Sequence, residues 1–255
     1  MSTTNSSAFP AGQVLVDVAC TEPVTYRAHF TNMWTFSRHT PNYPTNPHWS
    51  PPVVVTHSKN YTMWAVGSSA SAGVKLVAET GATGTLLEEI PDSKVKPSSV
   101  CGVGVGKVQF MDKGEDDQEV YVDVDESCGY LSMITMIAPS PDWFAGVNTR
   151  AICVDGKWVS VTVDLQPMDA GTDAGQKYRA ENNPESGGSI SEITPKHPAA
   201  VATKVFVESG AVKPVARLVL EPYPRGTVSA ASAAASLQNH PFLLTALLLA
   251  TCFFR

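Results

Sequence analysis

The chain is poor in charged residues and has no cluster of basic ones. Only 16% of its 255 residues are Asp, Glu, Lys or Arg, and the formal net charge is −6. Nucleic-acid phosphates attract a basic face, so this composition argues against a nucleic-acid partner. Apolar residues make up 43% of the chain, which is enough for a substantial core.

Several sequence signatures are also missing. No repeat of about 20–50 residues is visible, which argues against solenoids and propellers. No C-x-x-C pair occurs, so zinc-ribbon and thioredoxin-type sites have little support. There is no G-x-S-x-G elbow and no evident Ser/His/Asp set, and we therefore expect no enzymatic activity. His48 and His57 lack further zinc-ligand partners, and the acidic run with Asp116, Asp117 and Glu119 is more typical of a solvated loop.

The two ends of the chain differ in character. Residues 1–17 lack the basic and apolar regions of a signal peptide, and we expect them to be disordered or truncated, with a leader missing upstream. Residues 242–255 form an apolar tail of which a 13-residue helix would rise only about 20 Å, short of a membrane core of about 30 Å. Small residues in the spacer 227–241 and this short tail are typical of a GPI-attachment signal, and a marginal tail anchor is the alternative.

Short strand-like runs alternate with turn residues through the body of the chain, and Gly and Pro are plentiful. The sequence predicts an all-β fold, an antiparallel β-sandwich of about eight or nine strands with long loops, occupying residues 18–226 as one domain. Asp155-Gly156 predicts a hairpin turn within 149–165, and the proline-rich stretch 37–60 is expected to be mainly loop. The expected strands lie at 24–34, 61–67, 74–80, 106–112, 119–127, 131–139, 149–165, 202–209 and 215–222.

Two aspartates, Asp169 and Asp173, stand four residues apart in "DLQPMDAGTDAG". Gly171 and Gly175 allow a sharp loop that brings the two carboxylates together. Such carboxylates repel each other unless a cation lies between them, and calcium prefers oxygen ligands. The residues alone leave two interpretations open, a metal site and a capped turn.

The cysteines also leave two interpretations open. Four of the five, Cys20, Cys101, Cys128 and Cys153, lie in the body of the chain and are enough for two disulfides in an oxidising compartment. The alternative is buried free thiols in a cytosolic protein. Asn60 in "NYT" is a candidate glycosylation site.

Three stretches resemble the spondin domain family: residues 33–81, "MIAPSPDWFAGV" (136–147) and "DLQPMDAGTDAG" (164–175). The resemblance covers roughly residues 18–196, and 91–130 match poorly. It implies an extracellular, C2-like β-sandwich with a bound Ca²⁺. The family's metal-binding aspartates correspond to Asp142, Asp169 and Asp173, and its disulfide to Cys20–Cys153. Cys101 and Cys128 lie outside the family pattern and are candidates for a local disulfide.

These observations predict a calcium-binding adhesion or recognition domain, secreted into the extracellular matrix or held at the cell surface through its C-terminus. Its partner would be an extracellular protein or glycan, and Trp143, beside the metal site, is the candidate aromatic contact. Two alternatives remain. The domain could be an inert extracellular spacer with a purely structural metal, or a C2-like lipid binder whose loop tips would carry Trp143 and Phe144.

Overall fold

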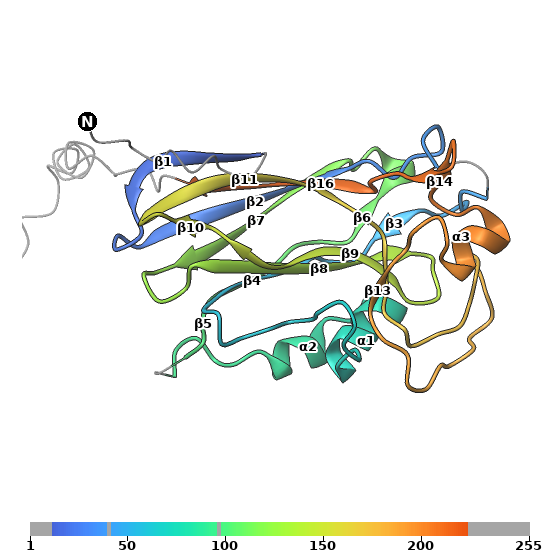
Figure 1. Cartoon of the computed structure of the whole chain (residues 1–255), viewed down its shortest axis with the longest axis horizontal. Coiled ribbons are helices and arrows are strands. Elements are labelled where there is room, and N and C mark those ends of the chain that lie inside the picture. The colour runs from blue at the N-terminus through green and yellow to red at the C-terminus, as the bar shows by residue number, and fades with distance from the viewer. Residues whose placement is uncertain (1–11, 40–41, 96–97, 224–255) are drawn as a thin grey trace, which may run out of the picture. The chain divides into compact units, whose positions relative to one another are not determined.

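The computed structural model describes residues 12–39, 42–95 and 98–223. Two antiparallel β-sheets face each other in this part of the chain (Figure 1). The first sheet has the strand order β1-β11-β16-β2-β7, and β10 pairs with β11. Its strands are β1 (Gln13–Ala19), β2 (Val24–Asn32), β7 (Asp117–Val124), β10 (Cys153–Val154), β11 (Lys157–Leu165) and β16 (Ala216–Tyr223).

The second sheet has the order β13-β12-β9-β8-β3-β6, and β4 pairs with both β8 and β5. A separate ribbon joins β14 (Val207–Glu208) to β15 (Ala211–Val212). The strands of the second sheet are β3 (His48–Trp49), β4 (Val53–His57), β5 (Val100–Val105), β6 (Gln109–Phe110), β8 (Tyr130–Ala138), β9 (Trp143–Ala151), β12 (Met168–Asp169) and β13 (Ser191–Glu192). A 3₁₀ turn, η1 (Met111–Lys113), follows β6. The predicted all-β antiparallel sandwich is thus confirmed.

Alternating residues build the core between the sheets. On β2, Tyr26, Ala28 and Phe30 are buried, while the residues between them are only half-buried. Because successive strand residues point to opposite faces, this alternation turns one side of β2 inward. The Tyr26 hydroxyl shares its proton between two carbonyl oxygens, those of Ile152 after β9 and Val159 on β11, at 3.0 and 2.9 Å.

The second sheet is covered on its other face by α1 (Ala72–Thr80) and α2 (Gly84–Glu89), as Figure 1 shows. All of β4 is buried, with Val54 in the core between the sheets and Val53 and Val55 in a second cluster under the helices. A strand covered on both faces is a continuous apolar run without alternation. This explains why β4 lies unrecognised within the stretch 37–60 that the sequence predicts to be loop.

Other local predictions are corrected. Residues 74–80 form α1 instead of a strand, because Ser71 Oγ accepts the N–H of Val74 and Gly81 ends the helix with φ 72°. The segment 202–209 contains the end of α3 (Pro198–Thr203) and only the two-residue β14. Residues 61–67 form no strand, and 106–112 contribute only β6 and η1. β1 begins at Gln13, ahead of residue 18, where the sequence places the start of the domain.

The predicted hairpin is confirmed. Val154 pairs with Lys157, and Asp155 and Gly156 have φ values of 50° and 75°, as a type I′ turn requires.

Both predicted disulfide pairs are confirmed, one within the first sheet and one between the two sheets. Cys20–Cys153 ties the residue after β1 to β10, and Cys101–Cys128 ties β5 to the turn after β7. Most of the glycine-rich stretch "CGVGVG" (101–106) belongs to β5, which passes close to β7. A Cβ on Gly102 would lie 2.4 Å from the carbonyl oxygen of Asp123, so only glycine allows this approach.

Candidate metal centre

Strand pairing brings two of the predicted ligands together. Asp142 directly precedes β9, and Asp169 ends β12. Asp169 is paired with Trp143 across the β12–β9 ladder, and the N–H of Ala170 donates to the carbonyl oxygen of Asp142 at 3.2 Å. Two aspartates that lie 27 residues apart in the chain thus occupy neighbouring positions at one edge of the second sheet.

The loop after β12 wraps around Asp142. Asp169 Oδ1 accepts the N–H of Gly171 at 2.8 Å, and Asp173 Oδ1 accepts the N–H of Gly175 at 2.8 Å. Between these two turns, the N–H groups of Thr172 and Asp173 donate to Asp142 Oδ2 at 2.8 and 3.1 Å. The glycines and aspartates of the motif therefore shape the loop, as the capped-turn interpretation predicts. They also place the backbone of Asp173 against the carboxylate of Asp142, so the metal interpretation stays open.

All three carboxylates are removed from solvent. The exposed fractions of Asp142, Asp169 and Asp173 are 0%, 8% and 4%. Burial raises the pKa of Asp142 to about 7, and the negative charge of Asp169 adds to this shift. Burial likewise raises the pKa of Asp169 to about 6, with a smaller contribution from the charge of Glu185. Buried carboxylates of like charge are costly unless a cation or proton compensates them.

One oxygen of this group has no hydrogen-bond partner. Asp142 Oδ1 is buried and unpaired, whereas Oδ2 accepts two backbone N–H groups. An orphaned carboxylate oxygen in an acidic, desolvated place fits a hard cation that prefers oxygen ligands. The donor set therefore suits Ca²⁺. The three aspartates are not drawn tightly together, since the one group of metal-ligand side chains within 4.8 Å of one another in the described residues lies elsewhere.

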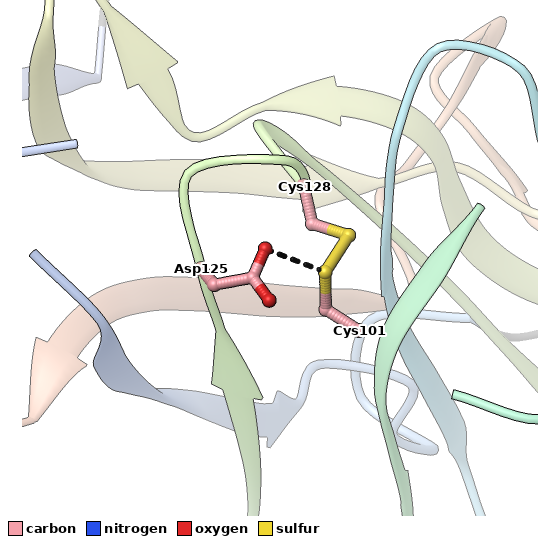
Figure 2. Close-up of side chains that lie close together, drawn as sticks. All are labelled: Cys101, Asp125 and Cys128. Atoms are coloured by element: carbon pink, nitrogen blue, oxygen red, sulfur yellow. Dashed lines mark hydrogen bonds between the residues drawn. A yellow bond between two sulfur atoms is a disulfide. The ribbon is translucent and has the colours of Figure 1, made fainter. Parts of the chain in front are cut away.

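That other group is Cys101, Asp125 and Cys128, and Figure 2 shows it. Both sulfurs belong to the Cys101–Cys128 disulfide, so neither carries a proton or a free thiolate for a metal. Asp125 Oδ1 lies 3.0 Å from Cys101 Sγ, which makes this a contact with the disulfide and not a true hydrogen bond. The same oxygen accepts the N–H and hydroxyl of Ser127 at 2.9 and 2.5 Å. The group is a capped turn fixed by a disulfide.

A hollow of about 350 Å³ opens beside the aspartate loop, lined in part by Asp169, Asp173, Glu185 and His197. Sequence reasoning missed Glu185 and His197, because neither has a spacing that links it to the aspartates. His197 Nε2 lies 3.4 Å from Asp169 Oδ2. This contact favours the imidazolium, yet burial outweighs it and lowers the pKa of His197, so we treat the contact as one between a neutral imidazole and a carboxylate.

Trp143 is not the exposed aromatic that the sequence predicts. Its side chain is 0% exposed and packs edge-on against Tyr178 and Phe206, each with ring centroids 5.4 Å away. It is buried because it begins β9 with its ring turned into the core between the sheets. Phe144 is also 0% exposed and packs against Trp64. Neither residue can insert into a bilayer or contact a partner, so the lipid-binding alternative loses its sequence basis.

Three further features bear on the predictions. Asn60 is exposed after β4, and its glycosylation stays a prediction. His57 Nε2 lies 2.8 Å from Ser132 Oγ, but both residues are 0% exposed, so this pair cannot reach a substrate. In the described part of the chain, no helix is long and apolar enough to cross a membrane. The spacer 227–241 and the tail 242–255 lie outside the described residues.

Comparison with known proteins agrees with the resemblance seen in the sequence. The family model described as Spondin_N matches residues 24–214. The chain is 36% identical to Spondin-1 of Gallus gallus over 206 residues, which cover 77% of this chain and 25% of that protein. It is 33% identical to Spondin-2 of Rattus norvegicus over 184 residues, covering 68% of this chain and 54% of the relative. A similar match, 30% identity over 205 residues, links it to Spondin-2 of Homo sapiens.

The chain thus spans about a quarter of the Spondin-1 relatives and somewhat more than half of the Spondin-2 relatives. The matched region contains β2 to β15 and all three aspartates of the candidate metal centre. A match over this much of the chain, on a two-sheet β-sandwich, means that the chain belongs to the Spondin_N family.

Proposed function

We propose that the chain is an extracellular, calcium-binding recognition domain in which the metal orders the loops that meet a protein or glycan partner. The observation that carries the metal is Asp142: buried, with Oδ1 unpaired and with its Oδ2 held by the loop that contains Asp173. Asp142, Asp169 and Asp173 would hold Ca²⁺ through carboxylate oxygens. The ion would supply the positive charge that these desolvated groups lack.

Calcium here would act through preorganisation instead of chemistry. The loop 170–175 already bonds to Asp142, and a bound ion would hold it more firmly against the start of β9. A surface that is ordered before binding loses less entropy when its partner arrives. The location follows from the two disulfides, which persist in oxidising compartments. A GPI anchor or tail anchor at residues 242–255 stays a prediction about the cell surface.

Thermal unfolding of the full chain, with calcium and with excess chelator, tests the metal site. A ligand that binds only the folded state stabilises it by about 2.7 kcal/mol at 100 times Kd. For a domain of this size, that corresponds to a rise in Tm of roughly 5–10 °C. We expect this rise in the wild type and its loss in Asp142→Asn.

The asparagine variant also separates a metal effect from simple damage. It keeps the shape of the side chain and removes one buried charge, so in chelator it should be at least as stable as the wild type. Asp112→Asn is the matched control, because Asp112 is exposed and the substitution removes the same charge. A calcium response that Asp142→Asn retains in full would contradict the assignment of Asp142. If calcium does not change the Tm of the wild type, the stretch 164–175 is a capped turn without a metal.

Partner binding that is unaffected by calcium removal in a folded protein would favour the spacer alternative, in which the metal is purely structural. The measurement is binding of the isolated partner, once identified, in calcium and in chelator. We expect the affinity to fall in chelator because the loops lose their order.

A further inference from the structure

A second hollow of about 350 Å³ lies next to the aspartate loop. Its walls come from three separate parts of the chain, residues 42–45, residues 177–179 and Thr203. Lys177 and Arg179 follow Asp173 by four and six residues. One continuous segment therefore lines both the acidic hollow of the metal centre and this second hollow, which carries charge of the opposite sign.

The aromatic walls of the second hollow are fixed by the core. Trp34 Nε1 donates to Tyr178 Oη at 3.1 Å, and Tyr43 Oη donates to the carbonyl oxygen of Trp34 at 2.9 Å. Both tyrosine rings pack on Trp34, with ring centroids 5.1 Å away for Tyr43 and 5.5 Å away for Tyr178. Across the hollow, Asn42 Nδ2 donates to the carbonyl oxygen of Thr203 at 2.8 Å. The hollow is therefore formed before any ligand arrives.

Its two cations are exposed and uncompensated. Arg179 Nη2 donates to the neutral hydroxyl of Thr45 at 2.8 Å, which orients the guanidinium and leaves its charge intact. Neither Lys177 nor Arg179 takes part in an ion pair with any other residue that the structure describes, although acidic residues outnumber basic ones by 24 to 18 in the chain. An oriented guanidinium with free N–H donors recognises carboxylates and other oxyanions in a bidentate manner.

We propose that this hollow binds the acidic group of an anionic glycan, a sulfate or a carboxylate, with the sugar ring against the half-buried ring of Tyr43. The volume suits a ligand of one or two rings, and a largely apolar wall with a few oriented polar groups is typical of small-ligand sites. This proposal gives the class of partner for the proposed recognition function, and it therefore rests on that function. Its walls are held by their own hydrogen bonds, so it does not need the metal.

Calorimetric titration of the full chain with a heparin-derived sulfated tetrasaccharide, in calcium buffer, tests the proposal. We expect saturable binding that weakens with added salt, because the contact is ionic. Lys177→Gln/Arg179→Gln should lose at least tenfold in affinity. The matched control is Lys59→Gln/Lys94→Gln, which removes the same charge from two exposed lysines that do not line the hollow, and it should change the affinity by less than twofold.

Further arms identify the anion and the class of partner. A desulfated tetrasaccharide that retains its uronates distinguishes carboxylate from sulfate recognition. Binding of either tetrasaccharide supports the proposal if that binding depends on Lys177 and Arg179. A hexapeptide of glutamates tests an acidic protein segment. No binding of either sugar, tighter binding of the peptide, or an equal loss in both double variants would overturn it. Repeating the titration with Asp142→Asn separates the two sites. If this variant, with Lys177 and Arg179 intact, loses glycan binding, the hollow is not independent of the metal.

Discussion

The two oxygens of the Asp142 carboxylate differ in their hydrogen bonding. Two backbone N–H groups stabilise its charge through Oδ2, while Oδ1 is buried without a partner. Burial dominates, so the pKa is raised from 3.8 to about 7. A group whose pKa is higher in the folded state stabilises the fold when it is protonated, and this contribution is lost as pH rises through the folded pKa.

The stability of the metal-free protein should therefore depend on pH through Asp142. We expect the free energy of unfolding of the wild type to fall relative to that of Asp142→Asn, by up to about 4 kcal/mol, as pH rises from about 4 to 8 in chelator. Urea unfolding of both proteins at several pH values measures this difference. A constant difference across the range would mean that Asp142 is not protonated in the folded state.

The comparison with the variant is needed because buried histidines act in the opposite direction. Burial lowers the pKa of His39 to about 4 and also lowers that of His57. Their contribution to stability is present above about pH 6.5 and is lost as pH falls. Both histidines are shared by the wild type and Asp142→Asn, so their effect cancels in the difference.

At the scale of single elements, α1 forms because of the capping residues at its two ends, although its composition favours a strand. Val74, Val77 and Ala78 are buried on one face of the helix, but the segment "VKLVAET" also reads as a strand because it is rich in β-branched residues. Its ends decide the outcome. Ser71 caps the first turn and Gly81 takes the left-handed conformation that ends the helix.

The cap gives a direct test of this element. Ser71→Ala should cost about 1 kcal/mol, because Ser71 Oγ accepts the N–H of Val74 at 3.1 Å and donates to Glu89 of α2 at 2.6 Å. Thr83→Ala is the matched control, since Thr83 occupies the same position in α2 but makes no capping hydrogen bond. Urea unfolding measures both. Equal losses in the two variants would contradict a specific role for the Ser71 cap.

At the scale of the whole molecule, the two disulfides constrain the unfolded chain to different extents. Cys20–Cys153 joins residues 133 apart, whereas Cys101–Cys128 joins residues 27 apart. In the chain-entropy account, the loss on removing a disulfide grows with the length of the closed loop.

Removing each pair by double alanine substitution should therefore rank them. We expect a loss of about 5 kcal/mol for Cys20→Ala/Cys153→Ala and about 3.5 kcal/mol for Cys101→Ala/Cys128→Ala. The free energy of unfolding in urea, measured without reductant, checks the order. A larger loss for the shorter loop would show that folded-state contacts at β5 outweigh the entropy of the long loop.

The residues alone left the state of the cysteines open, and the Cys20–Cys153 pairing came from the resemblance to the spondin domain family. The sequence by itself determined the all-β sandwich, the hairpin at Asp155-Gly156 and the sharp loop around Asp169 and Asp173. Each of these depends on local turn chemistry, strand alternation or a recognisable motif. Only the tertiary structure decided that 74–80 is a helix, that β4 lies buried in a proline-rich stretch and that Trp143 faces the core. It also brought Glu185, His197 and the Lys177–Arg179 hollow beside the aspartate loop. Burial on a particular face depends on which distant strands pack together, and no short stretch of sequence contains that information.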